Sequence, residues 1–205
     1  MPLLRGNYSP PAAGDNAWLG QRAPRHGLPF SWFMLAWDAC APGSAFEPYM
    51  PSLTPTDARF LRIAYEEAKA GFDEGGCPIG SVLADGDRMI ARGRNRRVQQ
   101  GDPIAHGEMD CLRRAGRQKS YRSMTLYTSL SPCMMCTGTI IQFAIPRVVV
   151  GEAQNFPGNP ELLRRHGVEV IIADDADCIA LMARFIREKP ELWAEDIAED
   201  VKEAG

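Results

Sequence analysis

The spacing of apolar residues predicts an amphipathic helix at the start of a patterned region that begins near residue 54. Apolar side chains recur three and four residues apart between Phe60 and Phe72, which is typical of one buried helix face. Thr54 or Thr56 is placed to cap this helix, and Gly75-Gly76 is placed to end it. The regular part of the chain therefore opens with a helix.

Short apolar runs after this helix predict five strands. The first two form a hairpin, because Asp85-Gly86 between them is a typical turn sequence. The fourth contains Val148-Val149-Val150, a continuous apolar run of the kind found in strands buried on both faces. The predicted strands cover residues 79–83, 89–91, 125–128, 147–150 and 168–172.

Helical patterns separate most of these strands. They cover residues 105–115 and 133–143, continue from Asp174 or Asp175 to Glu188, and resume near Pro190, whereas residues 94–103 read as a polar loop. Helices that alternate with strands after a hairpin predict helices on both faces of a mixed sheet. The expected fold is an α/β, three-layer α/β/α sandwich around a central five-stranded mixed sheet.

Residues 1–50 lack this patterning and predict a poorly ordered N-terminal extension ahead of a single domain at 51–205. Their aromatic run, Phe30 to Trp37, is too short to span a bilayer, and a secretory segment is the less favoured interpretation. Met50 immediately precedes the onset of patterning. One hypothesis is therefore that translation starts there and that residues 1–49 are not translated.

Net charge and cysteine content indicate which binding partners and which cellular compartment to expect. A formal net charge of −3 argues against a dedicated nucleic-acid-binding protein, although four arginines between Arg92 and Arg97 leave a local basic patch open. Six irregularly spaced cysteines do not resemble a secreted disulfide framework. We therefore expect a cytoplasmic protein that acts on a small molecule and has no membrane segment.

The chemistry-bearing residues fall in two short stretches, His106-Gly107-Glu108 and Pro132-Cys133-Met134-Met135-Cys136. One imidazole and two thiolates suit a zinc ion with three protein ligands, the number found in catalytic sites that keep a fourth position for water. The carboxylate two residues after the histidine is then a proton carrier outside the metal shell. Both halves in this order form the signature of zinc-dependent nucleobase deaminases.

The predicted local structure supports this interpretation. His106 and Glu108 start one expected helix, and Cys133 and Cys136 lie in the first turn of another. The positive end of a helix favours the thiolate, which is the metal-binding form. Zinc lowers the pKa of bound water from about 15.7 to about 7, and Glu108 is placed to accept the proton and pass it on.

The same motifs are compatible with two other kinds of site. Cys133 and Cys136 alone could form a thioredoxin-like redox pair, and the zinc could be structural in a binding module without catalysis. Neither alternative needs the separate His-x-Glu pair, so a catalytic zinc site is favoured.

Beyond these motifs, residues from about Thr56 to Asp200 resemble the fungal-type zinc cytosine deaminases of the cytidine deaminase superfamily. The resemblance rests on Ile63-Ala64-Tyr65-Glu66-Glu67-Ala68, Glu74-Gly75-Gly76, Pro78-Ile79-Gly80, Leu126-Tyr127-Thr128, Leu130-Ser131-Pro132-Cys133, Cys136-Thr137-Gly138, Ile145-Pro146-Arg147, Val150-Gly151-Glu152, Trp193 and Glu195-Asp196-Ile197. It implies a homodimer that converts cytosine to uracil and ammonia. It also implies that Glu108 is catalytic and that the base is bound by Asn95, Gly107, Phe156, Trp193 and Asp196.

The sequence departs from this family at Asp102-Pro103-Ile104-Ala105, directly before His106, and at Cys77. Because these positions adjoin the expected pocket, another aminated ring such as isocytosine, creatinine or guanine remains an alternative substrate. A tRNA adenosine deaminase shares the zinc core, but it needs a basic face for the phosphate backbone, which the acidic balance disfavours.

Overall fold

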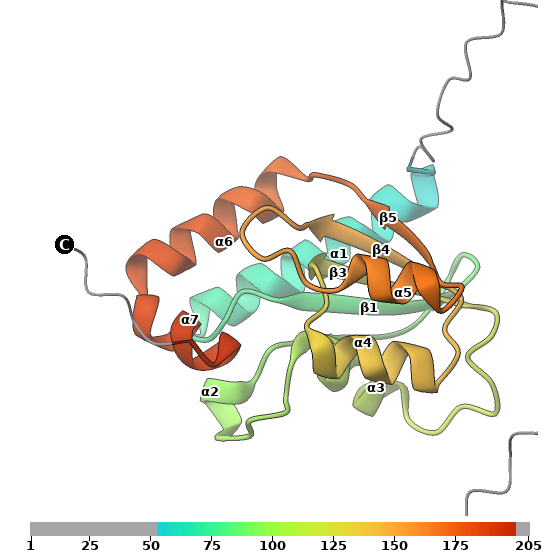
Figure 1. Ribbon diagram of the computed structural model, residues 1–205, viewed down its shortest axis with the longest axis horizontal. Coiled ribbons are helices and arrows are strands. Elements are labelled where there is room, and N and C mark those ends of the chain that lie inside the picture. Colours follow the sequence, from blue (N-terminus) through green and yellow to red (C-terminus); the bar gives the residue numbers. More distant parts are fainter. Residues whose placement is uncertain (1–52, 200–205) are drawn as a thin grey trace, which may run out of the picture. The chain divides into compact units, whose positions relative to one another are not determined.

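The computed structural model describes residues 53–199, so the predicted N-terminal extension lies outside the described residues. Within this range a five-stranded sheet lies between two layers of helices (Figure 1). The strand order is β2-β1-β3-β4-β5. The three-layer α/β/α sandwich with a mixed sheet is therefore confirmed.

The five strands lie where the apolar runs predicted them. They are β1 (Gly80–Asp85), β2 (Arg88–Arg94), β3 (Met124–Leu130), β4 (Arg147–Glu152) and β5 (Glu169–Ile172). β1 pairs antiparallel with both β2 and β3, whereas β3, β4 and β5 are parallel. The hairpin explains the antiparallel edge, and the crossover helices between later strands explain the parallel half.

The helices divide between the two faces of the sheet. α1 (Pro55–Asp73) and α6 (Ala176–Glu188) cover one face, and α3 (Gly107–Ala115), α4 (Met134–Gln142) and α5 (Pro160–Arg165) cover the other (Figure 1). Two short helices, α2 (Arg97–Gln100) and α7 (Pro190–Ile197), lie at one end of the molecule, on the left in Figure 1. That end carries the candidate site.

Alternation along the strands fills both interfaces of the sheet. On one face, α1 packs its residues Phe60, Leu61 and Ala64 against Val82, Ala84, Tyr127, Val149 and Ile171. The strand residues next to these face the other layer, where the buried side chains are Leu83, Cys111, Leu112, Met124, Leu126, Ile140, Ile145, Val148, Val150, Leu163, Val168 and Val170. This two-sided burial is what the continuous apolar run of β4 predicted.

Two short helices correct the sequence-based assignment. α2 lies inside the segment expected to be a polar loop, and α5 occupies a stretch for which no element was expected. The last helix begins at Pro190 as predicted. No helix within residues 53–199 combines the length and the apolar character needed to cross a bilayer.

A buried carboxylate, Asp57, ties the start of α1 to the sheet. Together with Thr54, it caps its own helix. It accepts a hydrogen bond from the hydroxyl of Tyr127 at 3.0 Å, and it forms an ion pair with both terminal nitrogens of Arg147 at 2.6 and 3.0 Å. Burial opposes ionisation, but the Arg147 and Thr54 donors outweigh it and hold the pKa of Asp57 well below its usual range. The charged form is therefore the one that stabilises the fold.

We expect Asp57→Asn to lower the free energy of unfolding by about 3–5 kcal/mol at pH 7, because it leaves Arg147 without its buried partner. Since the folded-state pKa of Asp57 is lowered, its full contribution exists above the unfolded pKa of about 3.9, begins to fall at that pH and is lost only as the pH falls through the folded-state pKa. Urea unfolding at pH 7 and at pH 3 measures both effects. The exposed Asp87, which lies 3.7 Å from Arg59, is the matched control, and Asp87→Asn should cost less than about 1 kcal/mol. Equal losses for the two variants would contradict this account.

Candidate metal centre and active site

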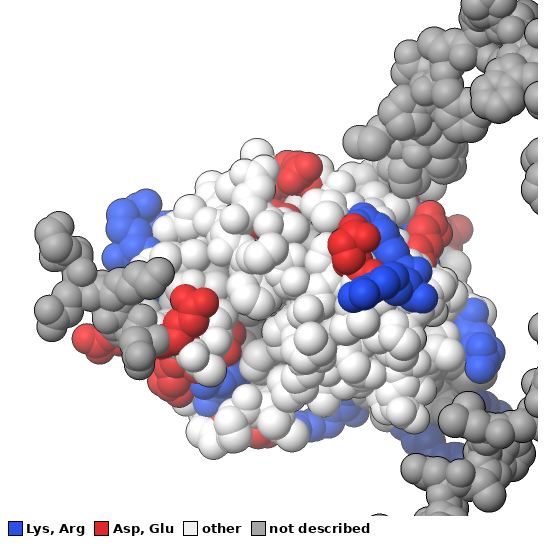
Figure 2. Space-filling view, viewed as in Figure 1, with Lys and Arg blue, Asp and Glu red and all other residues white. Residues whose placement is uncertain are grey.

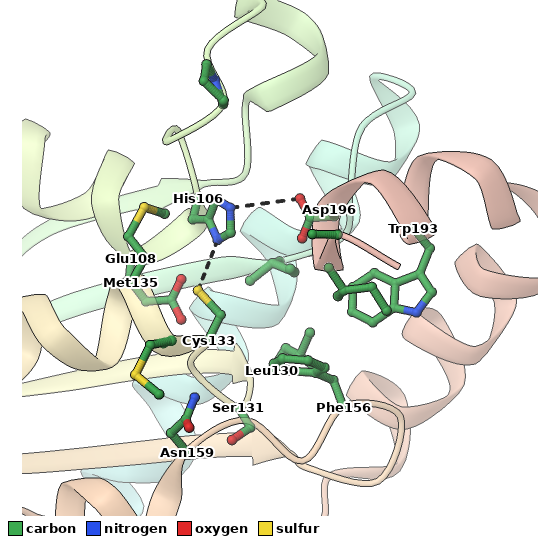
Figure 3. A pocket seen from close by; sticks show the side chains of 15 residues that line it. His106, Glu108, Leu130, Ser131, Cys133, Met135, Phe156, Asn159, Trp193 and Asp196 are labelled. Atoms are coloured by element: carbon green, nitrogen blue, oxygen red, sulfur yellow. Dashed lines mark hydrogen bonds and ion pairs between the residues drawn. The ribbon is translucent and has the colours of Figure 1, made fainter. Parts of the chain in front are cut away.

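Three potential metal ligands converge at the starts of two helices. His106 is the N-cap of α3, Cys133 is the N-cap of α4, and Cys136 lies in the first turn of α4. One ligand atom from each lies within 4.8 Å of the others, and Cys133 Sγ is 3.5 Å from His106 Nδ1 (Figure 3). The structure therefore brings together the three residues that the sequence predicted as ligands.

Local packing explains why the chain turns here. A Cβ on Gly107 would lie 2.7 Å from the carbonyl oxygen of Ile79, so only glycine lets α3 begin against this loop. On the other side, Ser131-Pro132 follows the end of β3 and leads directly into α4. The positive ends of both helices thus point toward the ligand cluster, which favours thiolates and bound anions.

The two cysteines differ in the pKa of their thiol groups. The hydrogen bond from Cys136 lowers the pKa of Cys133 to about 4. The same hydrogen bond, together with burial, raises the pKa of Cys136 well above its usual value. One thiolate therefore exists beside a thiol whose proton a metal cation would replace, and neutral imidazole completes a donor set that fits zinc.

Glu108 lies beside this cluster without belonging to it. Its carboxylate is buried, accepts the hydroxyl of Thr128 at 3.3 Å, and lies 3.4 Å from Cys136 Sγ. Burial and the negative charge of Cys133 raise the pKa of Glu108 above its usual value. A carboxyl group whose pKa is raised holds a proton more readily than an exposed one, which helps it to accept a proton and return it. Glu108 therefore suits proton transfer.

The ligand cluster forms one wall of a cavity of about 410 Å³. Figure 3 shows Trp193 and Phe156 across the cavity from His106 and Glu108, and Asp196 at its edge. The two aromatic rings meet edge to face with centroids 5.8 Å apart, a favourable aromatic geometry. Pro103, which the sequence analysis placed beside the pocket, lines the cavity. Further lining residues, which the sequence did not single out as site residues, are Ile79, Leu130, Ser131, Met134, Met135, Asn159, Ile197 and Ala198.

The loop that carries Phe156 is fixed by the buried carboxylate of Glu152. Glu152 accepts the backbone N–H groups of Gln154 and Asn155 at 2.7 and 3.0 Å. The hydroxyl of Ser131 donates to the carbonyl of Pro157 at 2.9 Å, which binds this loop to the start of α4. Phe156 is therefore held in a defined place relative to the metal ligands.

Asn95 takes a position different from the expected contact with a base. Its side chain is fully buried and is not among the cavity-lining residues. Its amide donates to Asp196 Oδ1 at 3.3 Å, and its oxygen accepts the backbone N–H of Arg97 at 3.1 Å. In this structure Asn95 therefore contacts Asp196, and its direct contact with a base stays a prediction.

Arg97 is a residue of this site that the sequence did not single out. Its guanidinium lies 2.5 Å from Asp196 Oδ1, and the same oxygen is 4.0 Å from His106 Nε2. Nothing in the sequence distinguishes this arginine from Arg92, Arg94 and Arg96, since all four lie in the same polar stretch.

Taken together, an α/β/α sandwich, three potential zinc ligands at two helix starts and a buried carboxylate beside them are the features of a zinc-dependent deaminase. Known proteins agree with this class. The family described as the cytidine and deoxycytidylate deaminase zinc-binding region matches residues 54–152. The cytosine deaminase of Candida albicans is 48% identical over 150 residues, which cover 72% of this chain and all of that protein.

More distant relatives share the same core. A tRNA-specific adenosine deaminase from Buchnera aphidicola is 40% identical over 110 residues, which cover 52% of this chain and 73% of that protein. Among solved structures, a tRNA A34 deaminase studied for A-to-I editing superposes with a TM-score of 0.55 and 26% identity, covering 60% of this chain and 99% of that one. This chain therefore belongs to the zinc-dependent cytidine deaminase superfamily and, within it, to the fungal-type cytosine deaminases.

Proposed function

We propose that this protein hydrolyses free cytosine to uracil and ammonia. The observation that carries the proposal is the 48% identity to the Candida albicans cytosine deaminase, which extends over the whole of that protein and over 72% of this chain. The cavity combines aromatic side chains for a flat ring with carboxylates for its amine and for proton transfer.

The residues around the cavity divide the work of binding. Phe156 and Trp193 supply apolar contacts for the pyrimidine ring, and Asp196 is placed to accept a hydrogen bond from the exocyclic amine. Backbone groups at Gly107, between His106 and Glu108, complete the polar contacts. Asn95 supports this arrangement through its hydrogen bond to Asp196.

Glu108 moves the protons of the reaction. His106, Cys133 and Cys136 would hold the zinc ion, which when bound would supply Lewis acidity that lowers the pKa of water to about 7. Glu108 accepts one proton from the attacking water and delivers it to the adjacent ring nitrogen. It then takes the remaining proton of the hydroxyl group now on the ring carbon and passes it to the amine, which leaves as ammonia as the C–N bond breaks and the carbonyl of uracil forms. Its hydrogen bond from Thr128 keeps the carboxylate oriented toward the metal ligands.

The surface favours a small substrate over tRNA. All four arginines of the basic stretch are paired with carboxylates: Arg92 and Arg94 with Glu67, Arg96 with Asp110, and Arg97 with Asp196. On the face shown in Figure 2, blue and red groups of the described residues lie around a largely uncharged centre. A binder of the phosphate backbone needs basic groups that are free to meet it.

A panel of aminated rings tests the substrate. Purified protein is incubated with cytosine, cytidine, isocytosine, guanine, adenine and creatinine, and ammonia and the product spectra are followed. We expect cytosine to have the highest kcat/KM. Ammonia from cytidine or guanine but not from cytosine would overturn the proposal.

Removal of the aromatic wall should weaken binding more than chemistry. We expect Trp193→Ala to raise KM for cytosine by about 5- to 150-fold, because stacking of an aromatic side chain on a base contributes about 1–3 kcal/mol. The zinc content should stay at that of the wild type. An unchanged KM in a folded, zinc-loaded variant would remove Trp193 from the binding site.

We also propose that the protein is a cytoplasmic homodimer. The groove between α3 and α4 is lined by apolar residues that include Met109, Met135 and Phe143, and Phe143 is 41% exposed. An exposed apolar patch of this kind is typical of a protein interface. The cysteines within residues 53–199 are all free thiols, which suits a reducing compartment.

Sedimentation equilibrium tests the dimer and its interface. We expect twice the mass of one chain for the wild type, and at least a tenfold weaker association for Phe143→Glu, roughly the cost of losing one central interface contact. Met89 is exposed to the same degree on the β2 edge, so Met89→Glu is the matched control and should remain a dimer. A monomeric wild type would contradict the proposal.

A further inference from the structure

The carboxylate of Asp196 uses its two oxygens differently. Within the described residues, Oδ1 lies near Arg97 at 2.5 Å, Asn95 at 3.3 Å and His106 at 4.0 Å. Oδ2 has no hydrogen bond to any residue in that part of the chain and is not among the buried, unpartnered atoms there. Asp196 itself lines the cavity. The protein thus occupies one oxygen and leaves the other accessible.

Arg97 is the group that holds this orientation. Its side chain is 11% exposed and that of Asp196 is 4% exposed, so the ion pair is largely removed from water. A buried carboxylate needs a charged partner, and a guanidinium fixes both its direction and its charge. Without Arg97, the amide of Asn95 would be the one hydrogen-bond donor to Asp196 Oδ1 within the described residues.

The same guanidinium also holds α7 in place. Besides Asp196, Arg97 binds the Glu195 carboxylate at 3.0 Å and approaches its backbone carbonyl at 3.5 Å. These contacts lie in the last turn of α7, whereas Lys189, just before the helix, donates to the carbonyl of Gly75 at 2.9 Å. α7 is therefore tied to the rest of the domain at both ends, and it carries Trp193 between them.

We propose that Arg97 is a positioning residue for substrate binding, which clamps α7 over the cavity and turns Asp196 Oδ2 toward the amine of the substrate. This inference rests on the proposed function and adds to it a group that does not touch the substrate. This role explains the position of the short helix α2, which begins at Arg97 directly after Asn95 and places the Arg97 side chain against the end of α7.

Steady-state kinetics with Arg97→Met, Arg97→Lys and Arg62→Met test the proposal. Arg62 forms a 2.7 Å ion pair with Asp177 that is mostly exposed, so Arg62→Met removes an arginine of similar geometry far from the cavity. We expect Arg97→Met to raise KM for cytosine by about 10- to 100-fold, the loss typical of a charged hydrogen bond, with zinc content and kcat changed far less. Arg97→Lys should recover part of this loss, and Arg62→Met should match the wild type.

A second readout does not depend on activity. Hydrogen exchange of residues 190–197 reports how firmly α7 is docked. We expect faster exchange in this segment for Arg97→Met and wild-type exchange for Arg62→Met. Wild-type exchange in Arg97→Met, or an unchanged KM, would overturn the clamp. If the wild type is inactive on cytosine but residues 190–197 still exchange faster in Arg97→Met than in the wild type, the proposed substrate is wrong. The role of Arg97 in holding α7 would then still stand.

Discussion

Replacement of Glu108 by glutamine is expected to lower kcat for cytosine by at least about 10³-fold, because one carboxylate carries each proton transfer of the reaction. The amide has nearly the same shape but cannot accept and return a proton. Residue 108 lies beside the three predicted metal ligands and is not one of them, so the variant should keep the zinc content of the wild type. Initial rates of uracil formation and metal analysis of the same preparation measure both quantities.

The control for this variant is Glu161→Gln, which changes an exposed carboxylate on α5. It should leave kcat and KM unchanged. Turnover of Glu108→Gln within tenfold of the wild type would exclude Glu108 as the proton carrier. Loss of zinc from the variant would instead make the carboxylate a ligand and would require a different catalytic group.

Removal of one thiolate should abolish metal binding. Cys136 is fully buried in the first turn of α4, and no other cysteine, histidine or carboxylate joins the three-residue cluster within the described residues. We expect Cys136→Ala to contain less than about one tenth of the wild-type zinc and to lose activity in parallel, since two remaining ligands cannot hold a catalytic zinc.

Cys178→Ala provides the comparison, because Cys178 is also buried but lies on α6 away from the ligands. It should lose some stability and retain its zinc. A zinc-loaded, active Cys136→Ala would contradict the assigned ligand set, whereas loss of zinc from both variants would point to unfolding.

The sheet could be predicted because its signals are local. β4 is a continuous apolar run, the β1–β2 hairpin carries Asp-Gly, and α1 begins with a capping threonine. The convergence of His106, Glu108, Cys133 and Cys136 could also be predicted, since each half of the motif lies within five consecutive residues. The spacing of residues within each motif was sufficient to predict side chains that meet at the starts of α3 and α4.

The two missed helices have different causes. α5 has a start signal, because Pro160 and Glu161 occupy its first turn, and its single buried residue Leu163 left too little periodicity to recognise. α2 is four residues long, has no buried residue, and is placed by Arg97 and Gln99 contacts with distant parts of the chain. Tertiary contacts of this kind leave no periodic pattern in the sequence.

The place of Arg97 illustrates the same limit within the site. Arg97 and Asp196 are 99 residues apart, so their pairing depends on how α2 and α7 meet at the end of the sheet. Asn95 likewise contacts Asp196 across 101 residues. Resemblance to a family indicated Asn95 and Asp196, whereas only the folded arrangement relates them to each other and to Arg97.

The measurement that tests this account most directly is a zinc titration of the purified protein with cytosine as substrate. Zinc is removed with a chelator and restored stepwise while uracil formation and bound metal are recorded. We expect activity to vanish in the metal-free protein and to rise in proportion to bound zinc up to one ion per chain. Full turnover of cytosine without bound metal would contradict the account.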